Sequence, residues 1–285
     1  MTVTVFTPAH ITGFFTIENN SDPMKNGSCG AGFLLDKGVK TTIKNSKNFK
    51  FNTNKGNNLI INNVLKYFKC DKDFEIIQDI QVPIGAGFGT SAASALSSTL
   101  ALNDFLNYGY SHTECGQIAH KVELSIGGGL GDVIAQTGYG LVLRKKPGAP
   151  GIGEIECFAE DIWVGVKSFS PINTSSVIGD KSYCKNICRI GQNCLNEFIR
   201  DYSIDNFVDL SYEFSVKTEL ISNEVKRCVD YFNLMDDIIG ASMAMLGNTV
   251  FVFAYNRSAF NELNIENFNI YQLNNKGIIH DKTQL

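Results

Sequence analysis

The sequence predicts an α+β fold arranged as two domains, and three observations lead to this prediction. Short segments of alternating apolar residues, such as residues 2–6, are typical of strands, and longer segments with apolar residues three or four positions apart, such as residues 92–106, are typical of helices. A run rich in proline and glycine at residues 147–153 separates two halves that each contain both kinds of segment. With 285 residues, the chain is long enough for each half to have its own core. We therefore predict domains at residues 1–153 and 154–285.

The first forty residues predict strands joined by a glycine-rich loop. Residues 2–6 alternate and predict a first strand, which is expected to end just before His10. The run Gly27–Gly32, which includes Ser28, can present backbone N–H groups to a carboxylate or a hydroxyl group. The residues that follow predict two strands paired with each other, at 33–35 and 39–43.

The most informative stretch of the chain is Pro83–Ala93, between a predicted strand at 74–82 and the predicted helix at 92–106. Its three glycines let the backbone approach a ligand closely, and the helix points free N–H groups and its positive dipole end at the loop. The stretch lacks the lysine of a Walker loop and the spacing of a dinucleotide fingerprint. Strand, loop and helix together predict a phosphate site made by Pro83, Gly85, Ala86, Gly87, Gly89, Thr90, Ser91 and Ala92.

Two acidic residues follow this loop in the chain. Ser111 and Glu114 predict a capping box for a helix that ends soon after Glu123, and a glycine-rich turn then leads to Asp132. Phosphoryl transfer needs a Mg²⁺ ligand and a group that orients or deprotonates the attacking hydroxyl, and Glu123 and Asp132 are our candidates for these two roles. The alternative is that Glu123 lies on a solvated helix face and that Asp132 is only an N-cap residue.

The second half predicts further strands and helices. The run Gly240–Gly247 carries methionines at 243 and 245, which we expect to pack in the core. A hydroxyl-rich loop is expected at residues 170–175. The predicted strands are at 162–166, 249–254, 268–273 and 277–279, and the predicted helices are at about 186–200, 206–218 and 222–233.

Composition and charge exclude several classes of protein. Hydrophobic residues make up 44% of the chain and charged residues 19%, which suits a globular enzyme and argues against disorder. The net charge is −4 and no basic block is present, so nucleic acid is not an expected partner. No signal peptide and no run of about 18 apolar residues is visible, so we expect a cytoplasmic protein without a membrane partner. A homodimer is one assembly that the sequence permits.

The eight cysteines are expected to be thiols, because disulfides are rare in a cytoplasmic chain. Cys184, Cys188 and Cys194 lie close together in the sequence. Their spacing fits no zinc or iron–sulfur pattern, so we predict no metal site there.

Taken together, these motifs resemble the GHMP kinases, the family of galactokinase, homoserine kinase and mevalonate kinase. Pro83–Ala93 is similar to the family's P-x-G-x-G-[LF]-G-[ST]-S-A-A loop, and Gly129–Asp132 is similar to its G-x-x-D frame. The run PAHITGFF at residues 8–15 and the segment at 22–43 resemble the archaeal pantoate kinase branch, which acts on the route to coenzyme A.

This resemblance implies an N-terminal half like domain 2 of ribosomal protein S5 and a ferredoxin-like C-terminal half, with the active site between them. It implies ATP and Mg²⁺ as cofactors and (R)-pantoate as the substrate that is phosphorylated. Within that frame the loop holds the triphosphate, Glu123 with Thr90 or Ser91 holds Mg²⁺, and Asp132 acts on the hydroxyl group. The candidate contacts to pantoate are His10, Ser28, Gly30 and Arg144.

His10 and Arg144 have further reasons to be on that list. A hydroxy-acid substrate needs a counter-charge, and arginine binds carboxylates through two parallel hydrogen bonds, although Arg144 could equally be a solvated cation of the linker. His10 stands where mevalonate-type relatives have a lysine that pairs with the catalytic aspartate, so it is also a catalytic candidate. Lys121 is a second candidate for that cation, but it lies on a different helical face from Glu123.

Two alternatives to a pantoate kinase stay open. One is another small-molecule kinase of the same family, of the mevalonate or homoserine type. The other is a catalytically inactive sensor that binds ATP, against which the presence of Glu123 and Asp132 argues. Most relatives also carry a glycine-rich third motif that supports the phosphate loop, whereas Gly240–Gly247 carries bulky methionines, so its supporting role is open.

Overall fold

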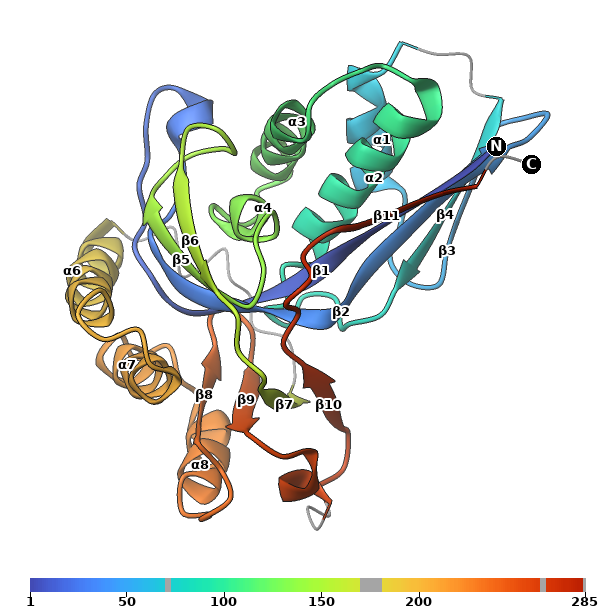
Figure 1. The fold of residues 1–285 in the computed structure, drawn as a ribbon. Helices are drawn as coiled ribbons and strands as arrows, with labels where there is room; N and C mark the ends of the chain where they lie inside the picture. Colours follow the sequence, from blue (N-terminus) through green and yellow to red (C-terminus); the bar gives the residue numbers. More distant parts are fainter. Residues whose placement is uncertain (70–72, 170–180, 262–264, 284–285) are drawn as a thin grey trace.

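Figure 1 shows the computed structural model of the chain, which describes residues 1–69, 73–169, 181–261 and 265–283. These residues form two sheets with helices packed against them, so the predicted α+β class is confirmed. The hydroxyl-rich loop expected at 170–175 lies outside the described residues. None of the helices in the described ranges is both long and apolar enough to cross a bilayer.

The first sheet has the order β11-β1-β2-β4-β3, with β5 paired to β2 and β6 paired to β5. Helices α1, α2, α3 and α4 lie together on one side of it (Figure 1). Its strands are β1 (Thr2–Phe15), β2 (Gly30–Asn45), β3 (Lys50–Thr53), β4 (Phe74–Ile80), β5 (Leu141–Lys146), β6 (Glu154–Phe158) and β11 (Ile279–Thr283). The helices of this half are α1 (Leu59–Val64), α2 (Thr90–Leu106), α3 (His112–Ser125) and α4 (Asp132–Ala135), with 3₁₀ turns η1 (Pro23–Lys25) and η2 (Leu65–Tyr67).

The second sheet is antiparallel and has the order β10-β7-β9-β8. Helices α7 and α8 pack against it, while α6 and α7 also reach β1 of the first sheet. Its strands are β7 (Trp163–Ser168), β8 (Gly240–Ala244), β9 (Thr249–Ala254) and β10 (Phe268–Gln272). Its helices are α6 (Lys181–Phe198), α7 (Ile204–Lys217) and α8 (Asn223–Phe232), with a 3₁₀ turn η3 (Arg257–Phe260).

The expectation that residues 33–35 and 39–43 pair with each other is wrong. Both segments belong to the single strand β2, which pairs along its length with β1, so that Leu34 lies opposite His10 and Gly38 opposite Pro8. Gly38 lies inside β2 and does not mark a turn. A Cβ atom there would lie 2.1 Å from the carbonyl oxygen of Thr7. The glycine is needed for the close approach of β1, where the strand has a register shift. β1 therefore continues to Phe15 instead of ending before His10.

The patterns in the sequence do not predict β3, β6 or β8. β3 is an exposed edge strand in a segment rich in asparagine and lysine, so little apolar alternation marks it. β6 does alternate, and its pairing with β5 continues the first sheet past residue 153. The last strand, β11, returns to pair with β1. The domain boundary at residue 153 stays a prediction.

Helix α2, which carries the glycine loop at its start, is held on the sheet by buried polar contacts. Almost all of its side chains are buried, including several serines that need partners away from water. Gln78 of β4 donates to the hydroxyl groups of Ser94 and Ser98, both at 2.9 Å, and Thr41 of β2 bonds Ser97 at 2.8 Å. These satisfied contacts fix the position of α2 relative to β2 and β4.

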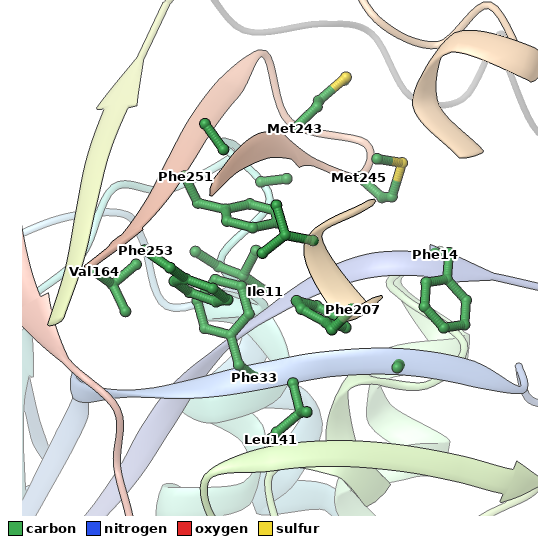
Figure 2. Packing of buried hydrophobic residues seen from close by; sticks show 14 of the residues in the cluster. Ile11, Phe14, Phe33, Leu141, Val164, Phe207, Met243, Met245, Phe251 and Phe253 are labelled. Atoms are coloured by element: carbon green, nitrogen blue, oxygen red, sulfur yellow. The ribbon is translucent and has the colours of Figure 1, made fainter. Parts of the chain in front are cut away.

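The largest apolar cluster joins the two sheets, so the two halves share a core. Phe33 of β2 lies at its centre (Figure 2), with ring centroids 6.1 Å from Phe207, 5.0 Å from Phe251 and 4.8 Å from Phe253. A second cluster lies between the first sheet and α1, α2 and α3. Because the first cluster spans both sheets, the sheets are expected to unfold together.

Phe33→Ala tests this shared core. We expect it to lower the free energy of unfolding by about 3–5 kcal/mol, because it removes buried contacts and leaves a cavity. Denaturant unfolding should be followed by the fluorescence of Trp163, on β7, and by far-UV circular dichroism. The two probes should give coincident transitions in wild type and variant. Tyr231→Ala, at an exposed position, is the control and should change stability by less than about 0.5 kcal/mol. Separate transitions would contradict the shared core.

Candidate active site

A cavity of about 450 Å³ is lined by residues from six separate parts of the chain. Five of these parts are the end of β1, the loop before α2, the glycine-rich segment before α4, β5 and the turn between β8 and β9, and Ser28 in the loop before β2 adds a sixth. The residues that line it are Thr12, Phe15, Ile17, Ser28, Ile84, Gly85, Gly87–Ser91, Gly127–Asp132, Arg144, Met245 and Leu246. The predicted phosphate loop and Asp132 therefore line the same cavity. Glu123 does not line it, but its carboxylate accepts a hydrogen bond from Ser91, which does.

The loop before α2 has the conformation expected for binding an anion. Gly85, Gly87 and Gly89 have φ values of 74°, 82° and 56°, a region that favours glycine. Gly89 is the N-cap residue of α2, and no side chain caps the first turn. The free N–H groups and the positive end of the helix dipole therefore face the loop. Of the eight residues predicted for this site, Pro83, Ala86 and Ala92 do not line the cavity.

The turn after β8 packs against the back of this loop. Gly240–Gly247 therefore supports the loop although it carries bulky methionines. A Cβ atom at residue 247 would lie 2.2 Å from the carbonyl group of Ala86, so only glycine fits there. Thr249 donates a hydrogen bond of 2.9 Å to the same carbonyl oxygen. Met243 and Met245 are buried in the shared core, as predicted. The second half of the chain thus fixes the backbone of the loop.

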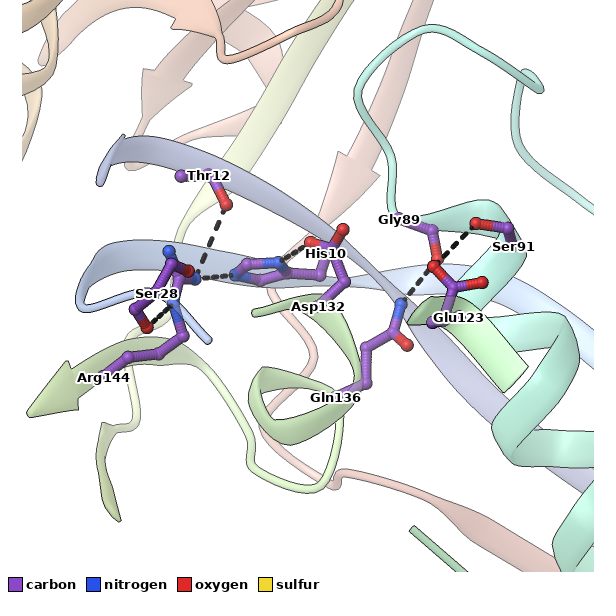
Figure 3. A network of polar contacts seen from close by, with 9 residues as sticks. All are labelled: His10, Thr12, Ser28, Gly89, Ser91, Glu123, Asp132, Gln136 and Arg144. Carbon is purple, nitrogen blue, oxygen red and sulfur yellow. Dashed lines mark hydrogen bonds and ion pairs between the residues drawn. The ribbon is translucent and has the colours of Figure 1, made fainter. Parts of the chain in front are cut away.

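Asp132, His10 and Arg144 form a line of polar contacts across the floor of the site (Figure 3). His10 Nδ1 is 2.7 Å from Asp132 Oδ1, and His10 Nε2 is 3.2 Å from Arg144 Nη1. An arginine can only donate, so Nε2 must accept and the proton of the imidazole lies on Nδ1. His10 is therefore neutral and donates its hydrogen bond to the carboxylate of Asp132.

The pKa shifts of His10 and Asp132 agree with this arrangement. Complete burial lowers the pKa of His10 below its ordinary value, Arg144 lowers it further, and Asp132 acts in the opposite direction without reversing the shift. Burial alone would raise the pKa of Asp132, but the hydrogen bond from His10 and the charge of Arg144 outweigh it, so the net pKa is lowered. Asp132 stays a carboxylate, and its side chain is 23% exposed, toward the cavity that it lines.

His10 does not fit the expected role of a direct substrate contact. Its side chain is completely buried, both ring nitrogens are engaged within the protein, and it does not line the cavity. It acts on the site by positioning Asp132. Lys121, the other candidate for a cation beside Asp132, is exposed on α3, whereas Arg144 is nearly completely buried. The cation that influences Asp132 is therefore Arg144, through His10.

Arg144 also connects this line to the loop at residues 27–32. Its Nε donates to the backbone oxygen of Ser28 at 3.3 Å, and the side chains of both residues line the cavity. The alternative of a solvated linker cation is therefore excluded for Arg144. Gly30, expected as a further substrate contact, does not line the cavity. It lies between β1 and β5, where a Cβ atom would meet the carbonyl oxygen of Phe14 at 2.2 Å.

Glu123 is completely buried at the other end of the site, so the alternative of a solvated helix face is excluded. Its Oε2 accepts a hydrogen bond of 3.0 Å from Ser91, whereas its Oε1 is buried without a partner. Burial, and then the charge of Asp132, raise the pKa of Glu123 to about 8, although hydrogen bonds from Ser91 and Gly129 partly oppose this. Thr90, the other candidate hydroxyl, donates instead to the carbonyl oxygen of Pro83 at 2.9 Å.

The glycines between α3 and α4 make room for the functional side chains. A Cβ atom at residue 128 would lie 2.2 Å from Glu123 Oε2, and one at residue 129 would lie 2.2 Å from Asp132 Oδ2. Gly131 is the N-cap residue of α4, and a Cβ atom there would lie 2.3 Å from Ser28 Oγ. Asp132 is thus the first helical residue and not an N-cap residue. Substitution of any of these glycines would displace a side chain of the site.

Gln136 is a residue of the site that the patterns above do not indicate. It is completely buried and lies one turn after Asp132, and its Nε2 donates to the carbonyl oxygen of Gly89 at 2.9 Å. It therefore ties α4 to the start of α2 and fixes the distance between Asp132 and the loop. The apolar lining residues, such as Phe15 and Leu130, are also not predicted. Gln136 lies four positions after Asp132, and this spacing could have indicated it. No local signal in the sequence indicates the apolar lining residues.

The cysteines of the described residues, seven in number, form no disulfide. Cys188 on α6 donates to the backbone oxygen of Ile17 at 3.4 Å, and Cys194 is buried. Within the described ranges, no group of three or more histidine, cysteine, aspartate or glutamate residues is placed to hold a metal ion by itself.

Comparisons with known proteins identify the family and the fold. Residues 58–140 match the model of the GHMP kinases N-terminal domain. The galactokinase of Lactococcus lactis, in complex with galactose, superimposes with a TM-score of 0.70 over 98% of this chain and 95% of its own, at 14% identity, which shows a common fold. The fold and the site therefore define a GHMP kinase.

Two further relatives are more specific. The pantoate kinase of Methanocaldococcus jannaschii is 36% identical over 268 residues, which cover 92% of this chain and 96% of the relative. A solved structure described as a phosphotransferase related to the coenzyme A biosynthesis pathway is 28% identical and superimposes with a TM-score of 0.87 over 99% of both chains. Within the GHMP kinases, the chain belongs to the pantoate kinase family.

Glu123→Gln tests the buried carboxyl group. In the metal-free protein, a pKa of about 8 means that the folded state keeps a proton that the unfolded state releases above the ordinary value of 4.5. Wild-type stability should therefore fall as the pH rises from 4.5 to 8, by a contribution on the order of 4 kcal/mol, and the neutral amide should remove this fall. Denaturant unfolding with a chelator present measures it.

Glu114→Gln is the matched control, because Glu114 is exposed and its pKa is lowered by its hydrogen bonds with Ser111. It should keep the wild-type slope between about pH 5 and pH 8. Equal slopes for wild type and Glu123→Gln over this range would mean that Glu123 is already ionised in the folded protein.

Proposed function

We propose that this chain transfers the γ-phosphoryl group of ATP to the primary hydroxyl of (R)-pantoate, giving ADP and (R)-4-phosphopantoate for coenzyme A biosynthesis. One observation carries the proposal: the anion-binding loop, Asp132 and Arg144 line one cavity. The family membership and the name of the pantoate kinase relative support the choice of substrate. A cytoplasmic location is part of this proposal. The homodimer stays a prediction.

The nucleotide would bind with its triphosphate on the loop before α2. Backbone N–H groups at Gly87–Ser91 and the positive end of the α2 dipole suit an anion without any lysine in the loop. The net charge of −4 gives the protein no general attraction for a polyanion. The affinity for ATP must therefore come from these local groups, and Gly247 and Thr249 support them by holding Ala86 in place.

Glu123 and Ser91 would hold Mg²⁺. The fit rests on Glu123 Oε1, a buried oxygen without a partner in the protein, since such an atom is costly unless a ligand satisfies it. Ser91 accompanies it because its hydroxyl is already within hydrogen-bond distance of the same carboxylate, whereas Thr90 is engaged with Pro83. Bound there, Mg²⁺ supplies neutralisation of the charge on the phosphate oxygens.

Asp132 would receive the hydroxyl group of pantoate. Its Oδ1 accepts from His10, so the other carboxylate oxygen can accept from the substrate. Because its pKa is lowered, Asp132 is a weak base that orients the hydroxyl and takes its proton as the bond to phosphorus forms. The new bond joins the substrate oxygen to the γ-phosphorus, and the bond from that phosphorus to the bridging oxygen breaks, so that the electron pair leaves with ADP.

Arg144 and Ser28 would bind the carboxylate end of pantoate. A guanidinium group has five N–H donors, and the hydrogen bonds of Arg144 to the described residues involve Nε and Nη1, so a carboxylate can share the same side chain. A substrate carboxylate in the buried surroundings of Arg144 would interact more strongly than at the surface. His10 would contribute from behind, by keeping Asp132 ionised and aimed.

An ADP-release assay with pantoate, mevalonate and homoserine, with and without Mg²⁺, tests the proposal. We expect Mg²⁺-dependent turnover with (R)-pantoate and little with the other two. Asp132→Asn should lower kcat by about 10²–10⁴-fold with little change in the KM for ATP, because it removes the group that orients and deprotonates the hydroxyl. Asp205→Asn, at an exposed position on α7, is the matched control and should keep wild-type activity.

Three results would contradict this account. Turnover with mevalonate or homoserine but not with pantoate would make the chain a different kinase of the family. ATP binding without any turnover would indicate a sensor. If Asp132→Asn keeps activity within a few-fold of wild type, the assignment of Asp132 is wrong. The substrate assignment depends on wild-type turnover alone and is not affected by that result.

A further inference from the structure

The cavity has an apolar wall for which the phosphoryl-transfer machinery has no use. Besides Ile84 and Phe88, which belong to the loop before α2, five of the lining residues are large and apolar: Phe15, Ile17, Leu130, Met245 and Leu246. Phe15, Ile17 and Met245 are buried in the shared core, whereas Leu130 and Leu246 are partly exposed and only pack against it. Triphosphate and Mg²⁺ need polar surroundings, so the apolar wall must face another part of the bound molecules.

Leu130 is the apolar residue whose place relative to the chemistry is best defined. It is the only residue with a side chain in Gly127–Gly131. Its neighbour Gly129 lies against Asp132 Oδ2, where a Cβ atom would come within 2.2 Å. Its other neighbour Gly131 lies against Arg144, where a Cβ atom would come within 2.8 Å of Nε. Leu130 therefore sits between the group for the hydroxyl and the group for the carboxylate.

The chemistry of pantoate has the same order. Its reacting CH₂OH group is bonded to a carbon that carries two methyl groups, and this carbon is followed by the CHOH group and the carboxylate. With the hydroxyl at Asp132 and the carboxylate at Arg144, the dimethyl carbon must lie between them. That is the part of the cavity that Leu130 borders, and two methyl groups are the apolar feature of this substrate that a leucine can contact.

We infer that Leu130 is a specificity residue that packs against the dimethyl carbon of pantoate. The inference rests on the function proposed above. Two consequences follow from the packing. A substrate with both methyl groups binds more tightly because the packing removes them from water. The packing also limits rotation of the adjacent CH₂–O bond, which keeps the hydroxyl near Asp132. An acceptor without the methyl groups has the same polar groups but leaves a gap beside Leu130.

The first test compares pantoate with (R)-2,4-dihydroxybutanoate, which lacks only the two methyl groups. We expect wild-type kcat/KM to favour pantoate by about 100-fold or more, since one methyl-sized group in an apolar pocket accounts for about 10–200-fold. Leu130→Ala should reduce this preference by about tenfold, by lowering kcat/KM for pantoate while that for the smaller acid and the KM for ATP stay nearly unchanged. Leu130→Met keeps the volume and should retain most of the preference.

The second test measures an increase in kcat/KM for a larger substrate, which a variant that is merely misfolded would not show. A pantoate analogue in which one methyl group is replaced by ethyl should be a poor substrate of wild type, because the pocket is filled. Leu130→Ala should use it better than wild type does, by about tenfold in kcat/KM. Leu234→Ala, at a position that is 85% exposed, is the matched control and should behave as wild type with all three acids.

The results separate this inference from the proposed function. If wild type does not phosphorylate pantoate at all, the proposed function fails and the inference fails with it. If wild type uses pantoate but does not prefer it to the smaller acid, only the inference fails. It also fails if Leu130→Ala lowers kcat/KM equally for both acids, because Leu130 would then only hold the loop in place.

Discussion

A completely buried, neutral histidine lies between an arginine and an aspartate, and the geometry of the site depends on this contact. His10 is placed by β1, Arg144 by β5 and Asp132 by α4, so three segments must be in register for the line to form. β2 provides that register, because it pairs with β1 on one side and with β5 on the other. The long antiparallel pairing therefore has a direct chemical consequence, the ionised and oriented carboxylate of Asp132.

The glycines before α4 have the complementary task of leaving space. Each of Gly128, Gly129 and Gly131 is in contact with a different polar side chain of the site, and a Cβ atom would collide with it. The backbone can therefore wrap closely around both carboxylates and Arg144. Burial of a carboxyl group beside a second carboxylate is costly: burial first, and then the charge of Asp132, raise the pKa of Glu123. A bound cation would offset that cost, and this links the stability of the site to its proposed ligands.

The parts of the site that could be predicted from the sequence are those whose chemistry is local. Pro83–Ala93 and Gly129–Asp132 are short, continuous motifs, and their conformations follow from glycine and from helix ends. The pairing of His10 with Arg144, which are 134 positions apart, has no local signal and depends on strand register. The same holds for Gly38. Its sequence context suggests a turn, but glycine is needed there because β1 approaches closely.

The protonation state of His10 shows whether Arg144 donates to its Nε2 and the ring in turn donates to Asp132. Nitrogen-15 NMR of histidine-labelled protein, with the signal assigned through His10→Gln, reports which ring nitrogen carries the proton. Near neutral pH we expect a neutral ring protonated at Nδ1 only, because burial lowers the pKa of His10 below its ordinary value. A ring protonated on both nitrogens near neutral pH, or one protonated at Nε2 alone, would contradict it, because Arg144 could then not be the donor to His10.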